Sequence, residues 1–180
     1  MFYMSIIKRL KDAFRIVLLV FILGFVLSGC GASADLERTN PKKLAKKEAE
    51  DIFEYIKAED IDSLVALFSS DVQKSHDLKK EWESFFEELD GKAVSYEGIS
   101  FPGEGMGVDK KGNIYDSHLS INYNNVKTDN GTTYTEFGYF QTRIDTAHPD
   151  REGINIFTFQ IVDKEGNKGE FITVGEYIEY

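Results

Sequence analysis

The pattern of hydrophobic residues changes its period at Asp90-Gly91. Before this pair, apolar residues recur every three or four positions, which is the spacing of helices that bury one face. After it, the chain is rich in β-branched and aromatic residues interrupted by turn signals, which is typical of strands. A run of helices followed by a run of strands predicts an α+β domain, with about three helices packed on a curved antiparallel sheet of four to five strands.

Three helices are predicted before Gly91. The first begins near Asn40-Pro41, because Asn caps helices well and Pro suits the first turn. The second begins after Asp60 or Asp62, and the third after Asp77. Trp82 lies in the middle of the apolar stripe of the third helix, so we expect it in the core rather than on a ligand platform.

Five strands are predicted after Gly91, over residues 92–101, 112–128, 132–146, 153–163 and 169–178. Asn130-Gly131 is a strong signal for a tight hairpin turn. The pattern Val-Asp-Lys-x-Gly-Asn occurs twice, at 108–113 and 162–167, each time between two strand-like runs. Neither copy has the spaced acidic series and closing Glu of a calcium loop, so both are interpreted as hairpin loops.

The first 29 residues have the layout of an export signal. Four basic residues up to Arg15 precede an apolar run from Ile16 to Leu27 that only Gly24 interrupts. A membrane-spanning helix needs about 20 mainly apolar residues, so this run is too short for a comfortable anchor. We therefore expect residues 1–29 to be a signal peptide that is removed.

Leu27-Ser28-Gly29-Cys30 resembles the lipobox of bacterial lipoproteins at all four positions. The resemblance implies that Cys30, the only cysteine, receives a diacylglyceryl group and that the chain is cut between Gly29 and Cys30. The predicted organisation is a signal peptide (1–29), a lipidated cysteine with a flexible tether (30–40) and one α+β domain (41–180). The predicted location is the extracytoplasmic face of the cell membrane. The alternatives are an ordinary secretory signal and a stray buried cysteine.

The charge of the mature chain argues against one class of partner. Removal of four basic residues and Asp12 with the signal leaves 17 basic and 30 acidic side chains, a formal net charge of −13. Nucleic-acid binding needs a positive surface, so no nucleic-acid partner is expected. One basic cluster could meet anionic lipid near the anchor or could be a solvated helix face; it consists of Lys42, Lys43, Lys46 and Lys47.

Two segments resemble an uncharacterised family of Gram-positive lipoproteins. They are Asp60-Ile61-Asp62-Ser63-Leu64-Val65-Ala66-Leu67-Phe68-Ser69 and Phe85-Phe86-Glu87-Glu88-Leu89-Asp90-Gly91-Lys92-Ala93-Val94-Ser95-Tyr96. The family is similar in fold to the cystatin-like, nuclear-transport-factor-like cone, in which helices lie across a curved sheet. The resemblance implies a fold with a pocket between sheet and helices, but it implies no activity.

One candidate polar ligand site follows from the expected Asn130-Gly131 hairpin. A two-residue turn places position i opposite position 261 − i, so His118 would face Arg143 and Asp116 would face Asp145 on one side of the sheet. Such a row could bind a polar or anionic ligand, or let His118 act as a base. The alternative is an ordinary solvent face with cross-strand charge pairs, and a one-residue bulge would disperse the row.

Other catalytic or cofactor sites find no support in the sequence. The three histidines are scattered, so no metal site is predicted, and no Gly-x-Ser-x-Gly or phosphate-loop pattern suggests a nucleophile or a nucleotide cofactor. Gly103-Glu104-Gly105-Met106-Gly107 is interpreted as a mobile loop between strands. We therefore expect a membrane-anchored module that binds a small ligand or an envelope partner. The alternatives are a cone-fold enzyme with an acid or base in its pocket and a purely structural envelope protein.

Overall fold

The computed structural model describes residues 41–162 and 167–178. The predicted signal peptide, lipobox and tether lie outside the described residues, as does most of the second Val-Asp-Lys-x-Gly-Asn turn. The packing reported below is that of the compact unit that begins at Ala45. No helix within the described ranges is long and apolar enough to cross a membrane.

The four α-helices of the described residues precede the strands, as the change of period at Gly91 predicted. The α-helices are α3 (Pro41–Ala58), α4 (Ile61–Val65), α5 (Ser70–Ser75) and α6 (Leu78–Glu88), and a 3-10 turn η1 follows later at Pro149–Arg151. The strands are β1 (Ala93–Ser95), β2 (Gly98–Val108), β3 (Ile114–Asn124), β4 (Val126–Thr128), β5 (Thr133–Tyr134), β6 (Phe137–Asp145), β7 (Gly153–Val162) and β8 (Lys168–Gly175). The α+β class is thus confirmed.

The helix starts follow local capping chemistry. The Asp60 carboxylate accepts a hydrogen bond from the Ser63 backbone N–H (3.1 Å), so Asp60 rather than Asp62 caps α4. Asp77 caps α6 as predicted, accepting from the Lys80 N–H at 3.5 Å. Helix α5, capped by Ser69, was not predicted, because six residues are too few to establish a helical period.

The strands form two antiparallel sheets, where a single sheet was predicted. The larger sheet has the order β2-β3-β6-β7-β8 and the smaller one the order β1-β4-β5. The predicted strand 112–128 is broken at Asn125, whose φ of +53° lies in the left-handed region that Asn tolerates. This residue turns the chain out of the large sheet, so that the Asn130-Gly131 hairpin belongs to the small one.

The glycine-rich segment 103–107 is part of strand β2, so its interpretation as a mobile loop is wrong. Its glycines alternate with larger residues and pair with β3, Gly105 opposite His118 and Gly107 opposite Asp116. A Cβ on Gly105 would collide with the His118 imidazole, and one on Gly107 would lie 2.6 Å from the Tyr115 ring. The glycines therefore make room for side chains of the neighbouring strand.

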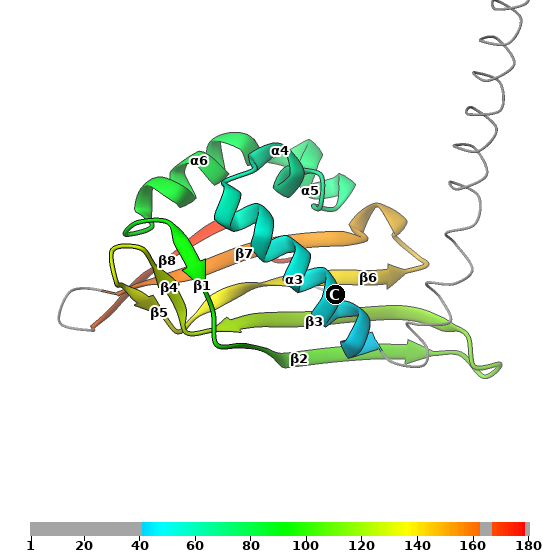
Figure 1. The fold of residues 1–180 in the computed structure, drawn as a ribbon. Helices are drawn as coiled ribbons and strands as arrows, with labels where there is room; N and C mark the ends of the chain where they lie inside the picture. Colours follow the sequence, from blue (N-terminus) through cyan, green and yellow to red (C-terminus); the bar gives the residue numbers. More distant parts are fainter. Residues whose placement is uncertain (1–40, 163–166, 179–180) are drawn as a thin grey trace, which may run out of the picture. The chain divides into compact units, whose positions relative to one another are not determined.

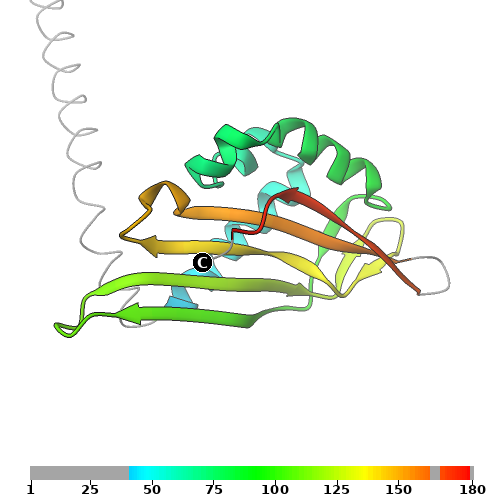
Figure 2. The same ribbon diagram turned by 180° about the vertical axis from the view of Figure 1, so that it is seen from behind.

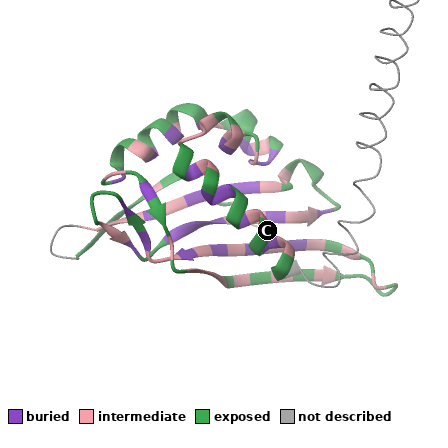
Figure 3. Cartoon of the chain, in the orientation of Figure 1, coloured by how far each residue is buried: buried purple, intermediate pink, exposed green. Residues whose placement is uncertain are grey.

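Aromatic side chains fill the space between the helices and the large sheet. Trp82 of α6 is fully buried, as predicted, with its ring centroid 4.9 Å from that of Phe85 and 5.2 Å from that of Phe157 on β7. Phe85 also contacts Phe159 at 4.7 Å. Burying each such side chain contributes roughly 1.5–3 kcal/mol. Figure 3 shows the resulting alternation of buried and partly exposed residues along the central strands.

The helices lie on one face of the large sheet (Figure 1), and the view from behind shows α3 on the far side of the strands (Figure 2). We call the opposite side the outer face. Its residues alternate with the core residues and are only partly exposed: along β3 these are Asp116, His118, Ser120, Asn122 and Asn124. The outer face therefore presents polar side chains that are partly open to solvent.

Candidate functional site

A groove of about 320 Å³ lies on the outer face of the large sheet. All five strands contribute to its polar and apolar lining, including Ser100 on β2, Ser120 and Asn122 on β3, Phe140 on β6, Thr158 on β7 and Phe171 on β8. Its size is at the lower end of the range of small-molecule sites, roughly 300–1,000 Å³. Among the lining residues only Glu136 is charged. The groove therefore suits a neutral ligand with apolar and hydrogen-bonding parts.

The Thr158 hydroxyl is buried in the groove without a hydrogen-bond partner among the described residues. Buried polar groups in folded proteins are nearly always hydrogen-bonded, so an unpartnered hydroxyl in a hollow indicates a place for a water molecule or a ligand. Gly138, which also lines the groove, has no side chain to fill this space. A Cβ at Gly138 would collide with the Ile121 carbonyl oxygen, so the close approach of β3 and β6 requires a glycine there.

Two exposed aromatic rings form part of the groove lining. Tyr177, which follows β8, is 59% exposed, and Phe171 is 54% exposed. The Tyr177 ring contacts that of Phe140, with 5.3 Å between the centroids. Large rings left open to solvent beside polar groups are typical of recognition sites, because they offer contact area at low conformational cost.

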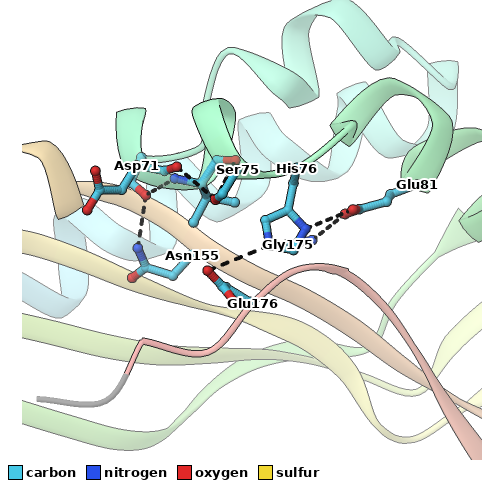
Figure 4. A network of polar contacts seen from close by, with 9 residues as sticks. Asp71, Ser75, His76, Glu81, Asn155, Gly175 and Glu176 are labelled. Carbon is cyan, nitrogen blue, oxygen red and sulfur yellow. Dashed lines mark hydrogen bonds and ion pairs between the residues drawn. The ribbon is translucent and has the colours of Figure 1, made fainter.

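The segment that carries Tyr177 is held by a polar network around His76 (Figure 4). The Glu81 carboxylate lies 2.8 Å from His76 Nδ1 and accepts a hydrogen bond from the Gly175 backbone N–H, also at 2.8 Å. Glu176 Oε1 lies 3.7 Å from His76 Nε2. The hydrogen bond to Glu81 raises the pKa of His76 above its ordinary value, since it stabilises the protonated imidazole. The network thus ties the end of β8 to helix α6.

The fully buried side-chain amide of Asn155 fixes β7 to its neighbours. The Asn155 side chain accepts a hydrogen bond from the Thr142 hydroxyl (2.7 Å) and donates to Ser69 Oγ (3.2 Å) and to the Arg151 carbonyl (3.1 Å). The backbone carbonyl of Asn155 accepts a hydrogen bond from the Glu176 backbone N–H at 3.0 Å. Asn155 therefore connects β6, the Ser69 cap and the segment after β8 at one point.

Two of the four predicted site residues come together on the outer face. Asp116 Oδ2 lies 3.5 Å from His118 Nδ1, and both side chains are partly exposed. The His118 ring lies above Gly105 and contacts the Phe140 ring, with 5.6 Å between the centroids. His118 therefore adjoins the groove, because Phe140 belongs to both.

The predicted pairing of His118 with Arg143 is wrong. Asp116 pairs with Asp145 as expected, but the register shifts after Ser117, and His118 faces Thr142 instead. The hairpin itself sets this register, because Val126 pairs with Tyr134 and Lys127 with Thr133, one residue off the pairing of a two-residue turn. A bulge on β6 then restores the expected pairing at Asp116. Arg143 forms an ion pair with Glu48 on α3 at 2.6 Å, with only 7% of its side chain exposed.

The Asp145 carboxylate is bound by backbone N–H groups of the turn that follows β6. It accepts hydrogen bonds from the backbone N–H groups of Ala147 (3.0 Å) and His148 (2.9 Å), and so shapes the turn after β6. The predicted four-residue row is therefore divided into an Asp116–His118 pair, a helix-side ion pair and a turn.

A second hollow of about 370 Å³ lies on the helix side of the sheet. Its lining includes Glu48, Asp51, Tyr55 and Gln141. Glu48 is already bound by Arg143, and the aromatic core occupies the deeper space. In the described part of the chain, no group of three His, Cys, Asp or Glu side chains is placed to hold a metal ion.

The residues that form the groove were not singled out from the sequence. Thr158, Phe171 and Tyr177 are separated along the chain and belong to no motif. Their only signal is the period of two within each strand, which places a residue on one face but does not say which strands adjoin.

A family model described as "Domain of unknown function (DUF5104)" matches residues 51–164, well over half of the chain. The matched segment runs from α3 through β7 and includes most of the groove. The search of curated proteins found no match.

Proposed function

Because the chain belongs to the DUF5104 family, whose description names no function, we propose its function from the geometry of the groove: the domain is a binding module for a neutral ligand that combines apolar faces with hydroxyl or amide groups. The unpartnered Thr158 hydroxyl carries this proposal. A short saccharide is the ligand chemistry that fits best, because its ring faces pack on aromatic side chains while its hydroxyls bond to Ser, Thr and Asn.

Charge supports a neutral ligand. The groove lining contains Glu136 but no basic side chain, and the mature chain carries a net charge of −13. An anionic ligand would meet this acidic background without a cation to neutralise it, since charges of one sign repel at short range.

We further propose that the protein is an extracytoplasmic lipoprotein, held at the cell membrane by lipid on Cys30. The support is the sequence alone: the signal layout and the Leu27-Ser28-Gly29-Cys30 motif. Two acyl chains suffice for stable anchoring. Metabolic labelling with a fatty-acid analogue should mark the wild-type chain and leave Cys30→Ser unlabelled; an unlabelled wild-type chain would remove this proposal.

The finer fold assignment, a cystatin-like or nuclear-transport-factor-like cone, is also a proposal. A five-stranded antiparallel sheet with helices on one face supports it. In this protein the space between helices and sheet is largely packed with aromatic rings, which favours the outer face as the binding side. An enzyme with its acid or base on the helix side would have to use the hollow beside α3, where Glu48 is already paired with Arg143.

Ligand binding can be tested by titrating the protein with neutral mono- and disaccharides, including N-acetylated amino sugars, and following its melting temperature and its amide NMR shifts. We expect shifts at groove residues that saturate. Thr158→Val should weaken binding several-fold without loss of stability, because it removes an unpartnered hydroxyl and keeps the shape.

Thr173→Val is the matched control, since Thr173 is the exposed partner of Thr158 across the sheet and does not line the groove. It should bind as the wild type does. If no sugar shifts the spectrum, or if Thr158→Val binds as tightly as Thr173→Val, the proposed function is refuted.

A further inference from the structure

The β2–β3 hairpin ends in a rigid, basic turn. The Asp109 carboxylate accepts hydrogen bonds from the backbone N–H groups of Lys111 and Asn113, each at 2.8 Å, and from the Asn113 side-chain amide, also at 2.8 Å. Gly112 takes the left-handed conformation, with a φ of +82°. Lys110 and Lys111 are both exposed on this turn. The acidic side chain is thus bound within the turn, and the two lysines face solvent.

Three large apolar side chains lie next to these lysines and are open to solvent. Met106 is 46% exposed, Val108 49% and Tyr115 51%. Met106 and Val108 alternate with Gly107 along β2 and project from one face of the hairpin, whereas the Tyr115 ring lies over Gly107 on the other face. The apolar side chains therefore flank the end of the hairpin on both faces. Only three other large hydrophobic residues of the described chain are comparably exposed, and two of them line the groove.

The hairpin end is accessible in the fold. Figures 1 and 2 both show the tip of β2–β3 extending beyond the helices, away from the small sheet β1-β4-β5. We call residues Met106–Tyr115 the hairpin end. It combines apolar side chains with two lysines in a domain that is otherwise acidic.

We infer that the hairpin end contacts an anionic lipid surface and thereby orients the domain at the membrane. This inference rests on the proposed lipid anchor. Lysines beside aromatic and aliphatic residues are the composition of segments that lie in the membrane interface, with the apolar groups among the headgroups and the cations near lipid phosphates.

A lipid surface fits this patch better than a second copy of the chain. Stable protein interfaces bury roughly 1,200–2,000 Å² in total, which three half-exposed side chains cannot supply. A membrane contact needs far less, because the lipid on Cys30 would already hold the chain there and the hairpin would only select an orientation. For a strongly acidic domain, presenting its basic end also reduces repulsion from anionic lipid.

The test uses the full lipidated protein in vesicles. A Met106→Cys variant is labelled with an environment-sensitive fluorophore, since Cys30 is the only other cysteine and would be blocked by lipid. In vesicles containing phosphatidylglycerol, we expect a blue shift and quenching by spin-labelled lipid. The matched control is Val94→Cys in β1, which is equally exposed at 46% and should be neither shifted nor quenched.

Charge is tested separately. The double variant Lys110→Ala, Lys111→Ala should lower the ratio of membrane-bound to free hairpin roughly 30-fold. This is the effect expected for two lysines near an anionic surface. Lys127→Ala with Lys168→Ala, on β4 and β8, should leave the Met106 label quenched.

Mass spectrometry of the same samples distinguishes failure of the hairpin contact from failure of the proposed lipid anchor. With lipid present on Cys30, a Met106 label that is no more quenched than the Val94 label overturns the hairpin contact and leaves the anchor intact. A chain without lipid on Cys30 overturns the proposed anchor and the inference with it. A blue shift at Met106 that depends on protein concentration, without vesicles, would identify a self-association surface and also overturn the inference.

Discussion

Replacement of Asn155 by Ala is expected to be among the most damaging single changes of a polar residue in the domain. The substitution removes three side-chain hydrogen bonds, to Thr142, Ser69 and Arg151, and both side-chain partners are fully buried. Each intramolecular hydrogen bond contributes about 0.5–1.5 kcal/mol net, and the burial of the groups involved adds to the cost of losing it. We therefore expect a loss of about 3–4 kcal/mol in the free energy of unfolding.

Urea denaturation followed by the fluorescence of Trp82, the only tryptophan and fully buried, measures this loss directly. Gln160→Ala is the matched control, because it removes an amide that donates one exposed hydrogen bond, to the Gly169 carbonyl at 3.1 Å. Its cost should stay below about 1 kcal/mol. Equal midpoints for Asn155→Ala and Gln160→Ala would refute the reasoning from buried hydrogen bonds.

A double-mutant cycle identifies the source of the loss. Thr142→Val removes the hydroxyl that donates to Asn155. If the Thr142–Asn155 hydrogen bond accounts for part of the cost, the double variant should be more stable than the sum of the single effects predicts, by about 1 kcal/mol. Strict additivity would assign the loss of Asn155→Ala to its other contacts.

Two further predictions concern residues around the groove. The raised pKa of His76 means that its pairing with Glu81 stabilises the fold fully below the unfolded value of 6.5, and that this contribution is lost as the pH rises through the folded pKa. Urea titrations over this range should show the loss, and Glu81→Gln should reduce it, because Glu176 still favours the protonated imidazole. Gly105→Ala should lower the free energy of unfolding by about 1–3 kcal/mol and shift the His118 ring resonances, because the new methyl group displaces the imidazole. Gly169→Ala, whose Cβ would meet its nearest neighbour at 3.5 Å, is the control and should be neutral or slightly stabilising. A neutral Gly105→Ala would contradict the packing of His118 on β2.

Features that depend on neighbouring residues were predictable from the sequence. The Asp77 cap, the burial of Trp82 and the turn at 108–113 were all predicted and confirmed, because each follows from a few consecutive residues or from helical spacing. The change of period at Gly91 likewise fixed the order of helices and strands.

The glycine-rich segment of β2 shows where local reasoning fails. Gly103, Gly105 and Gly107 have low strand propensity, so the segment was interpreted as a loop. Its strand conformation comes from pairing with β3, whose His118 and Tyr115 side chains occupy the space that the glycines leave. Such a fit between distant residues has no signature in either segment alone.

The four-residue site predicted from the sequence was wrong for a related reason. The register is one residue off the predicted one from the Asn130-Gly131 hairpin as far as His118, which places Arg143 on the helix side beside Glu48. A bulge restores the predicted pairing at Asp116 with Asp145. A period of two makes every face assignment sensitive to a single inserted residue. Only the pairing of whole strands decides where the insertion falls.

The sequence by itself determined the fold class, the Asp77 cap, the buried tryptophan and a signal and lipobox pattern whose test lies in lipid chemistry. The tertiary structure alone decided the division into two sheets, the separation of Asp116 and His118 from Arg143, and the groove around Thr158. The physical reason is range: caps, turns and helical faces arise from contacts within a few residues. A groove on a sheet is assembled from strands whose order and register are set by the packing of the whole domain.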